Sequence, residues 1–472
     1  MVSTPPNILF LCTDQQRFDM LGAAGNPHVA TPNLDRLAAE SVLFENCYVQ
    51  NPVCSPSRAS LMTGQYVAAH GLHANGVDLP TGAPLFSRLL ADGGLIGKFR
   101  LGACGGGRSE PRTDDGFRVF RWAHDPYPGS SENAYHRWLR AAHPELHAAV
   151  LDGSESADTL PTQAHYSRWV ADEAIEFLTT GRRGDRPFLL IANFFDPHHG
   201  FGAPPEYRER YDAAALPPPV TTDDEPDTRP TLFAEASRRS YAGHARGWAE
   251  YTDDELADAR AEYYAMVTLV DDEVGRILDR LDAEGLAEDT VVVFTSDHGE
   301  MLGDHRLMLK GPFHYDCAVR VPLIVRRPGT APDRRAELVQ WVDLAPTLLD
   351  LAGLPPAPTH QGDSLTGLLR GDATGWRDWA LCQYRDSGHA HDPPVHVTML
   401  RHDRWKLAVH HGAPATGRGR TGELYDLVTD PDELVNLWDD AGHRDVRTGL
   451  QEKLLDVLVA TEDRSAPRLD HW

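Results

Sequence analysis

The segment Asn51–Gly64 contains the residues best suited to chemistry, a cysteine followed four positions later by an arginine. Cys54 stands at the expected start of a helix, because Ser55 can cap that helix and Pro56 suits its first turn. Free backbone N–H groups and the helix dipole favour an anion there. Arg58, about one turn further on, can bind a tetrahedral oxyanion through two N–H groups. The segment predicts a nucleophile facing a phosphate- or sulfate-like group, with a buried cysteine beside a structural arginine as the alternative.

Three short apolar runs end in acidic, amide or histidine side chains. The runs cover residues 7–12, 187–195 and 291–295, and the side chains after them are Asp14, Gln15, His198, Asp297 and His298. Runs of this length that are apolar on both faces are typical of central strands in a parallel sheet. Ligands of open parallel sheets bind outside the carboxyl ends of the strands. We therefore expect one crevice to hold all five residues, although ordinary Asp-rich turns would give the same pattern.

Helical patterns alternate with these strands and indicate an α/β fold. The predicted helices cover residues 34–41, 169–179 and 254–281. Such alternation predicts a large, mostly parallel sheet with helices on both faces.

The last hundred residues have a different pattern. Short runs at 396–400 and 404–410 flank a hairpin signal, a further strand is expected at 423–427, and a terminal helix at 443–461. This indicates a smaller antiparallel sheet packed with one helix. We predict a catalytic α/β domain at residues 1–360 and a smaller C-terminal α+β subdomain at 361–472.

The composition excludes some classes of partner. The 472 residues include 70 Asp and Glu against 45 Lys and Arg, a formal net charge of −25. Non-specific binding to nucleic acid or to an anionic membrane needs a basic surface, so neither partner is expected. No apolar run approaches the roughly 20 residues of a membrane span, and no signal peptide is recognised, so we expect a cytoplasmic protein. The six scattered cysteines are typical of reduced thiols.

The residues from Cys54 to Gly64 resemble the signature of type I sulfatases, which belong to the alkaline phosphatase superfamily. Further segments resemble other motifs of that family, namely Asn7–Gln15, Thr31–Leu37, Gly97–Gly102, Thr295–Gly299 and Val342–Leu348. In that family the signature cysteine is oxidised after translation to formylglycine, and the modifying enzyme reads the proline and the arginine. The resemblance implies this modification at Cys54 and a formylglycine-generating enzyme as a maturation partner.

The resemblance also implies one divalent metal, with ligands Asp14, Gln15, Asp297, His298 and the modified Cys54. Carboxylate and amide oxygens favour Ca²⁺, with Mg²⁺ as an alternative, whereas an imidazole shifts the preference towards Mn²⁺ or Zn²⁺. The commoner family pattern has a second Asp and an Asn where this chain has Gln15 and His298. That departure resembles choline sulfatases and phosphonate monoester hydrolases. Ca²⁺ is the first expectation.

Further roles follow from the same resemblance. The metal would lower the pKa of a formylglycine hydrate hydroxyl, which attacks sulfur and forms a covalent sulfo-enzyme intermediate. The charge on the transferred group would be neutralised by Arg58, Lys98 and Lys310. Lys310 and His198 are candidates to protonate the leaving oxygen.

Arg100 departs from the family pattern, which usually has a histidine that deprotonates the hydrate. An arginine cannot be a base at working pH. Either Arg100 is another anion clamp, or a different group such as His199 or His314 accepts the proton.

The sequence thus predicts a sulfuric ester hydrolase acting on a small-molecule sulfate ester. A phosphonate monoester or phosphodiester hydrolase on the same site is the alternative, because sulfate and phosphate monoanions share size and geometry. An unmodified binding protein or pseudoenzyme is a third reading. The natural substrate and the oligomeric state stay open.

Overall fold

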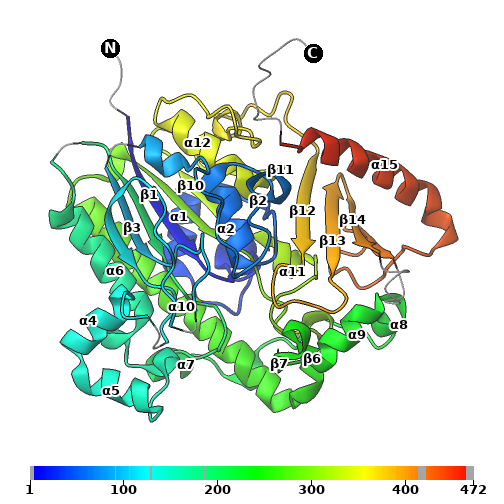
Figure 1. The fold of residues 1–472 in the computed structure, drawn as a ribbon, viewed down its shortest axis with the longest axis horizontal. Helices are drawn as coiled ribbons and strands as arrows, with labels where there is room; N and C mark the ends of the chain where they lie inside the picture. The colour runs from blue at the N-terminus through cyan, green and yellow to red at the C-terminus, as the bar shows by residue number, and fades with distance from the viewer. Residues whose placement is uncertain are drawn as a thin grey trace.

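The computed structural model describes residues 5–90, 92–105, 107–127, 130–184, 186–412 and 421–463. Figure 1 shows a large twisted sheet covered by helices, with a smaller sheet beside it that carries α15 on its outer side. The helices are α1 (Pro32–Ala39), α2 (Cys54–Thr63), α3 (Val67–His70), α4 (Ala134–Ala142), α5 (Pro144–Asp152), α6 (Tyr166–Glu176), α7 (Pro205–Arg208), α8 (Glu225–Thr228), α9 (Thr231–Arg238), α10 (Asp253–Ala283), α11 (Asp316–Val319), α12 (Leu344–Leu351), α13 (Thr366–Leu369) and α15 (Arg444–Ala460).

The large sheet has nine strands in the order β11-β2-β10-β8-β1-β5-β3-β4, with β9 paired to β2. Their bounds are β1 (Asn7–Thr13), β2 (Val42–Tyr48), β3 (Gly93–Gly97), β4 (Phe117–Trp122), β5 (Leu189–Asn193), β8 (Thr290–Ser296), β9 (Arg320–Val321), β10 (Leu323–Arg326) and β11 (Asp333–Gln340). The central strand β1 is parallel to both β5 and β8, with Cys12 opposite Asn193 and Thr295. The carboxyl ends of these three strands therefore meet at one edge. Only β9 and β10 run antiparallel to their neighbours.

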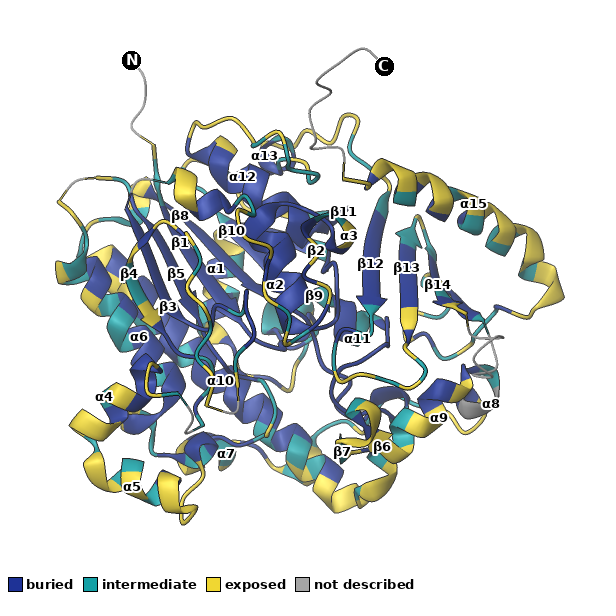
Figure 2. Ribbon diagram, in the orientation of Figure 1, coloured by how far each residue is buried: buried dark blue, intermediate teal, exposed yellow. Residues whose placement is uncertain are grey.

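Both faces of the large sheet are buried, which explains the continuous apolar runs. Leu9 and Leu11 of β1 belong to a core with α1, α6 and α10. Ile8 and Phe10 point to the opposite core, which includes residues of α2 and α12. Figure 2 shows the buried sheet between helices whose outer surfaces are exposed. The predicted α/β architecture is confirmed.

The C-terminal part forms the expected antiparallel sheet with one helix. Its order is β12-β13-β14-β15, with bounds Trp379–Arg385, His396–His402, Trp405–His411 and Gly422–Asp426. Leu450 and Leu454 of α15 pack against Leu400 and Leu407 of this sheet. The division of the chain at residue 360 stays a prediction. No helix in the described ranges has the length and apolar character needed to cross a membrane.

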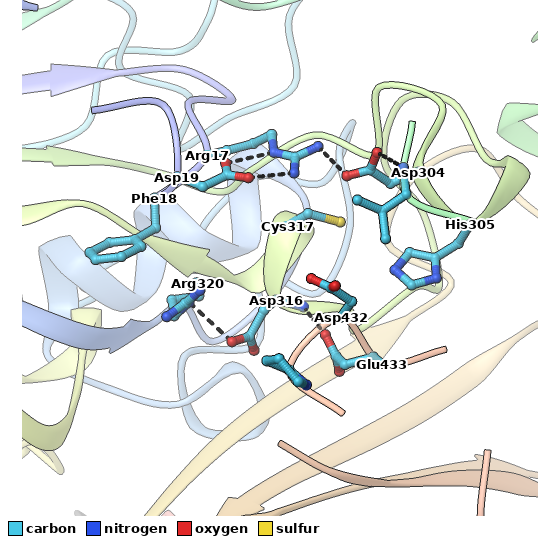
Figure 3. Close-up of a pocket in the computed structure, with 12 residues that line it drawn as sticks. Arg17, Phe18, Asp19, Asp304, His305, Asp316, Cys317, Arg320, Asp432 and Glu433 are labelled. Carbon is cyan, nitrogen blue, oxygen red and sulfur yellow. Dashed lines mark hydrogen bonds and ion pairs between the residues drawn. The ribbon is translucent and has the colours of Figure 1, made fainter. Parts of the chain in front are cut away.

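Buried charges join the small sheet to the large one. Lys406 on β14 contacts Asp316 and lies 2.6 Å from Glu433 Oε1, and Glu433 Oε2 accepts a hydrogen bond from the Asp316 backbone. Asp316 and Glu433 line a cavity of about 90 Å³. Figure 3 shows these two residues and, on the other side of the cavity, Arg17 bridging Asp19 and Asp304. Burial raises the pKa of the Glu433 carboxyl to about 7, although Lys406 opposes the rise. Lys406 and Glu433 of the C-terminal part are thus joined to Asp316 of α11 by charged contacts.

We expect Lys406→Met to lower the free energy of unfolding by about 3–5 kcal/mol, because it leaves buried carboxylates without their ammonium partner. Lys453→Met is the matched control, since Lys453 pairs with the exposed Asp378 and should contribute about 0–1 kcal/mol. Urea-induced unfolding of both variants measures the difference. Equal losses for the two lysines would show that the junction between the two sheets does not depend on Lys406.

Candidate functional site

The edge where β1, β5 and β8 end gathers the predicted polar residues. Asp14 and Gln15 follow β1, and Asp297 and His298 follow β8. The Gln15 backbone N–H donates to Asp297 Oδ1 over 3.0 Å, so the two strand ends are joined directly. His298 Nε2 lies 3.7 Å from both Asp14 Oδ1 and Asp297 Oδ1. The structure therefore brings these four predicted residues together.

Helix α2 brings the cysteine and the arginine to the same place. Its first residue is Cys54, with Val53 in the N-cap position, so the expected cap at Ser55 is wrong by two residues. The Ser55 N–H, one of the free donors of the first turn, is accepted by Asn75 Oδ1 at 3.1 Å. Gly64 ends the helix with a positive φ of 62°, a conformation that glycine adopts without strain.

Cys54 lies at the centre of a buried polar cluster. Its Sγ is 3.2 Å from His298 Nε2, 3.3 Å from Lys310 Nζ and 3.7 Å from Asp14 Oδ1. Burial raises the pKa of the Cys54 thiol and Asp14 raises it further, but Lys310, Lys98 and His298 outweigh them and lower it to about 6. The site therefore stabilises negative charge at the Cys54 side-chain position.

Arg58 and Lys98 neutralise the two carboxylates of the cluster. Arg58 Nε lies 2.8 Å from Asp297 Oδ2, and Arg58 Nη2 lies 3.4 Å from Asp14 Oδ2. Lys98 Nζ forms an ion pair with the same Asp14 oxygen. Burial raises the pKa of Asp14, but Lys98 and the other cations nearby hold it well below its usual range. Both carboxylates are therefore surrounded by cationic groups.

The residues present fit a divalent cation. One ligand atom each of Asp14, Cys54, Asp297 and His298 can be chosen so that all lie within 4.8 Å of one another. Two carboxylates, an imidazole and a group at position 54 that becomes an oxygen on oxidation form a donor set of the kind that Ca²⁺, Mg²⁺ or Mn²⁺ accepts.

Glu300 is a site residue that the sequence analysis missed. Its buried carboxylate accepts a hydrogen bond from Gln15 Nε2 and is held by the backbone N–H groups of Leu302 and Leu309, at 2.9 and 2.5 Å. Gln15 Oε1 consequently faces Lys310 Nζ at 2.6 Å. The sequence did offer one signal: Glu300 stands three residues after Asp297 and directly follows the recognised motif Thr295–Gly299.

The histidines differ in how they relate to this cluster. His199 Nδ1 lies 3.3 Å from Gln15 Oε1, and the His198 ring stacks on it with centroids 3.9 Å apart. Burial holds the pKa of both imidazoles well below the usual value, and so both are neutral at pH 7. His314 is buried, and neither ring nitrogen has a hydrogen-bond partner in the described part of the chain. The structure thus brings His198 and His199 to the site.

Arg100 lies beside the cluster with its guanidinium directed elsewhere. Its Nη1 is 3.2 Å from Cys104 Sγ and 3.0 Å from His124 Nε2, and its backbone has a positive φ of 67°. Its Nε is buried and has no partner among the described residues. Arg100 therefore keeps an unused donor close to the site.

Comparison with known proteins agrees with this geometry. The sulfatase family model matches residues 6–354, and the model of the C-terminal part of N-sulphoglucosamine sulphohydrolase matches residues 303–460. The uncharacterized sulfatase YidJ of Escherichia coli (strain K12) is 30% identical over 97% of this chain and 88% of its own length. The arylsulfatase of Clostridium perfringens (strain 13 / Type A) is 29% identical over 97% and 95%.

Among solved structures, the phosphonate monoester hydrolase of Agrobacterium radiobacter superposes with a TM-score of 0.84. It is 27% identical, and the match covers 99% of this chain and 98% of that one. The family model alone spans well over half of the sequence. The chain therefore belongs to the sulfatase family and is a sulfuric ester hydrolase.

Proposed function

We propose that the chain hydrolyses sulfate esters through a formylglycine formed at Cys54, with one divalent metal. The observation that carries this proposal is the position of Cys54 Sγ, 3.2 Å from His298 and 3.3 Å from Lys310 in a buried cluster of metal-type ligands. Formylglycine supplies a geminal diol, one hydroxyl of which displaces the alcohol from sulfur while the other expels sulfate.

The metal would be held by Asp14, Gln15, Asp297 and His298 together with residue 54. Bound there, it would polarise a substrate oxygen and lower the pKa of a hydroxyl on residue 54. Ca²⁺ is the first expectation, with Mn²⁺ or Mg²⁺ as alternatives. Glu300 supports this set by fixing the Gln15 amide with its carbonyl oxygen towards the cluster.

The cations around residue 54 would bind the transferred group. Lys98 and Lys310 reach Cys54 Sγ within 3.9 and 3.3 Å, so both can contact an anion attached there. Arg58 fixes the carboxylates and adds a third positive charge. Lys310, with His198 as an alternative, would donate a hydrogen bond to the leaving oxygen.

Phosphonate monoester hydrolysis is a second candidate function. It is favoured by the structural similarity to the phosphonate monoester hydrolase and by Gln15 and His298 at the metal-ligand positions. Paired assays with a nitrophenyl sulfate and a phenyl phosphonate separate the two reactions.

The modification itself is the first test. We expect Cys54 to become formylglycine when the chain is made together with a formylglycine-generating enzyme, with a loss of roughly 18 Da in the tryptic peptide. Because Cys54 and Arg58 are 1% and 3% exposed, the enzyme must act before folding is complete. Mass spectrometry measures the conversion, and sulfatase activity should follow it.

Folded, unmodified protein incubated with the same enzyme is the control and should stay unconverted. Cys54→Ala should be inactive under both conditions. Full activity of protein that carries only the unmodified thiol would contradict the proposed chemistry.

Arg100 gives a second test. We expect it to bind the transferred anion through its free Nε without moving a proton, because its guanidinium stays charged. Arg100→Ala should then lower kcat/KM by about 10²–10³-fold, and Arg100→Lys should recover part of the loss. Arg100→His should add an ionisation near neutral pH to the rate profile. Near-normal activity of Arg100→Ala would show that the side chain serves only its contacts with Cys104 and His124.

Glu300→Gln tests the support of Gln15. The variant loses the charged acceptor that fixes the Gln15 amide, so the affinity for the divalent metal should fall roughly 10–100-fold, with activity partly restored by excess metal. Isothermal titration with Ca²⁺ and Mn²⁺ measures the affinity. Glu423→Gln is the control, because Glu423 is equally buried but binds His410 in the small sheet. If Glu300→Gln changes only thermal stability, Glu300 does not position the metal ligand.

A further inference from the structure

A surface hollow of about 450 Å³ begins one residue away from the nucleophile cluster. Its walls come from the segment after β5, the short strand β7 (Ala245–Arg246), the start of α10 and the segment before Lys310. The lining includes His199, Phe201, Arg246, Tyr251, Glu255 and Asp258. The volume is large enough for a substituted arene or a sugar unit.

Two wall residues connect the hollow to the site. His199 Nδ1 lies 3.3 Å from Gln15 Oε1, the same oxygen that accepts a hydrogen bond from Lys310 Nζ. Leu309 precedes Lys310 and donates its N–H to Glu300. Lys310 is 3.3 Å from Cys54 Sγ and follows Leu309 in the chain, so the hollow lies next to the group that we expect to contact the leaving oxygen.

The charge of the hollow is mainly negative. Three carboxylates line it, those of Glu255, Asp258 and Glu262, against the guanidinium of Arg246. Arg208, outside the lining, lies 2.8 Å from Asp258 and 3.4 Å from Glu262, so the three carboxylates and the two guanidiniums leave one net negative charge. The Arg246 guanidinium is already engaged, 2.9 Å from Glu255 and stacked 3.9 Å over the Tyr251 ring.

The amino-terminal end of α10 does not favour an anion either. The amino end of a helix favours negative charge, but the first turn of α10 carries Asp253, Asp254 and Glu255. The Thr252 N–H is taken by Glu255 Oε2 at 2.9 Å, and the Glu255 N–H by Thr252 Oγ1 at 3.2 Å. These two N–H groups are therefore occupied within the chain.

We propose that this hollow binds the alcohol part of the sulfate ester and selects leaving groups that are uncharged or cationic over anionic ones. The proposal rests on the proposed function of the neighbouring cluster. Phe201 offers an aromatic surface for an arene or the apolar face of a sugar, beside the Tyr251 ring that Arg246 covers. The carboxylates attract an ammonium and repel a carboxylate or a second sulfate.

Three esters of one shape test the selection: para-ethylphenyl sulfate and its amino-terminated and carboxyl-terminated analogues. The terminal groups are insulated from the phenol, so its reactivity is nearly constant. Binding to metal-loaded Cys54→Ala, which cannot turn the esters over, should be about tenfold tighter for the ammonium ester than for the carboxylate ester at low salt. The neutral ester should lie between them. Equal dissociation constants would overturn the proposal.

Charge-reversal variants test whether the preference for the ammonium ester arises in the hollow. In the same Cys54→Ala background, Asp258→Lys should remove or invert the preference. Asp279→Lys is the matched control, an equally exposed position on α10 about 31 Å further along the helix, and should leave it unchanged. If both reversals act alike, the preference reflects the net charge of the molecule and the hollow is not the binding site.

A bulky substitution tests whether the esters occupy the hollow. Ala259 lines it, and Ala259→Trp should weaken the binding of all three esters at least tenfold while inorganic sulfate binds as before. Unchanged ester binding would overturn the proposal. Turnover by the wild-type enzyme tests the proposed function separately. If the three esters bind in the expected order of affinity but none is hydrolysed, the proposed function is rejected, and the hollow is still the binding site for the alcohol part.

Discussion

The structure around the nucleophile depends on the pairing of buried charges. Asp14 and Asp297 are fully buried, and such carboxylates are tolerated only when cations and hydrogen bonds replace the water they lose. Arg58 from α2 pairs with both, and Lys98 from the end of β3 pairs with Asp14. These pairs connect segments that are far apart in sequence, so the ends of β1, β3 and β8 and the start of α2 are fixed relative to one another.

This arrangement also explains why the site can bind an anion although the chain is acidic overall. Most of the acidic side chains behind the formal charge of −25 lie outside this cluster, and water and salt screen the exposed ones. Inside the cluster, Lys98, Lys310 and Arg58 balance the carboxylates of Asp14, Asp297 and Glu300, and a divalent metal would make the balance positive. The local field therefore favours a sulfate group, while the carboxylates at the start of α10 act on whatever is attached to it.

Much of the fold could be predicted because its signals are local. The apolar runs behind β1, β5 and β8 and the 3.6-residue pattern of α10 identified their elements, and the rule for strand ends brought Asp14, Gln15, Asp297 and His298 together correctly. The cap at Ser55 was misplaced because Val53 precedes the helix in extended form without a capping side chain. Glu300 was missed for a different reason: its role depends on contacts with Gln15 and Leu309 that only the folded chain creates. The direction of Arg100 towards His124 likewise depends on a partner 24 residues away that no motif marks.

The two candidate reactions of this site differ little at the transferred group. A sulfate monoester and a phosphonate monoester each bring a tetrahedral group with one negative charge, and Arg58, Lys98 and Lys310 would bind both by the same contacts. The ion pairs and the geometry close to residue 54 can therefore set the rate of transfer, but they contribute little to the choice between a sulfate ester and a phosphonate ester. Discrimination must come from parts of the substrate that differ, namely the group retained on phosphorus in a phosphonate and the alcohol that leaves. In this chain the alcohol that leaves would lie beyond His199 and Leu309, where the walls of the hollow are acidic and aromatic. The physical control of specificity thus lies in side chains of α10 and of the segment after β5, outside the motifs that identify the family.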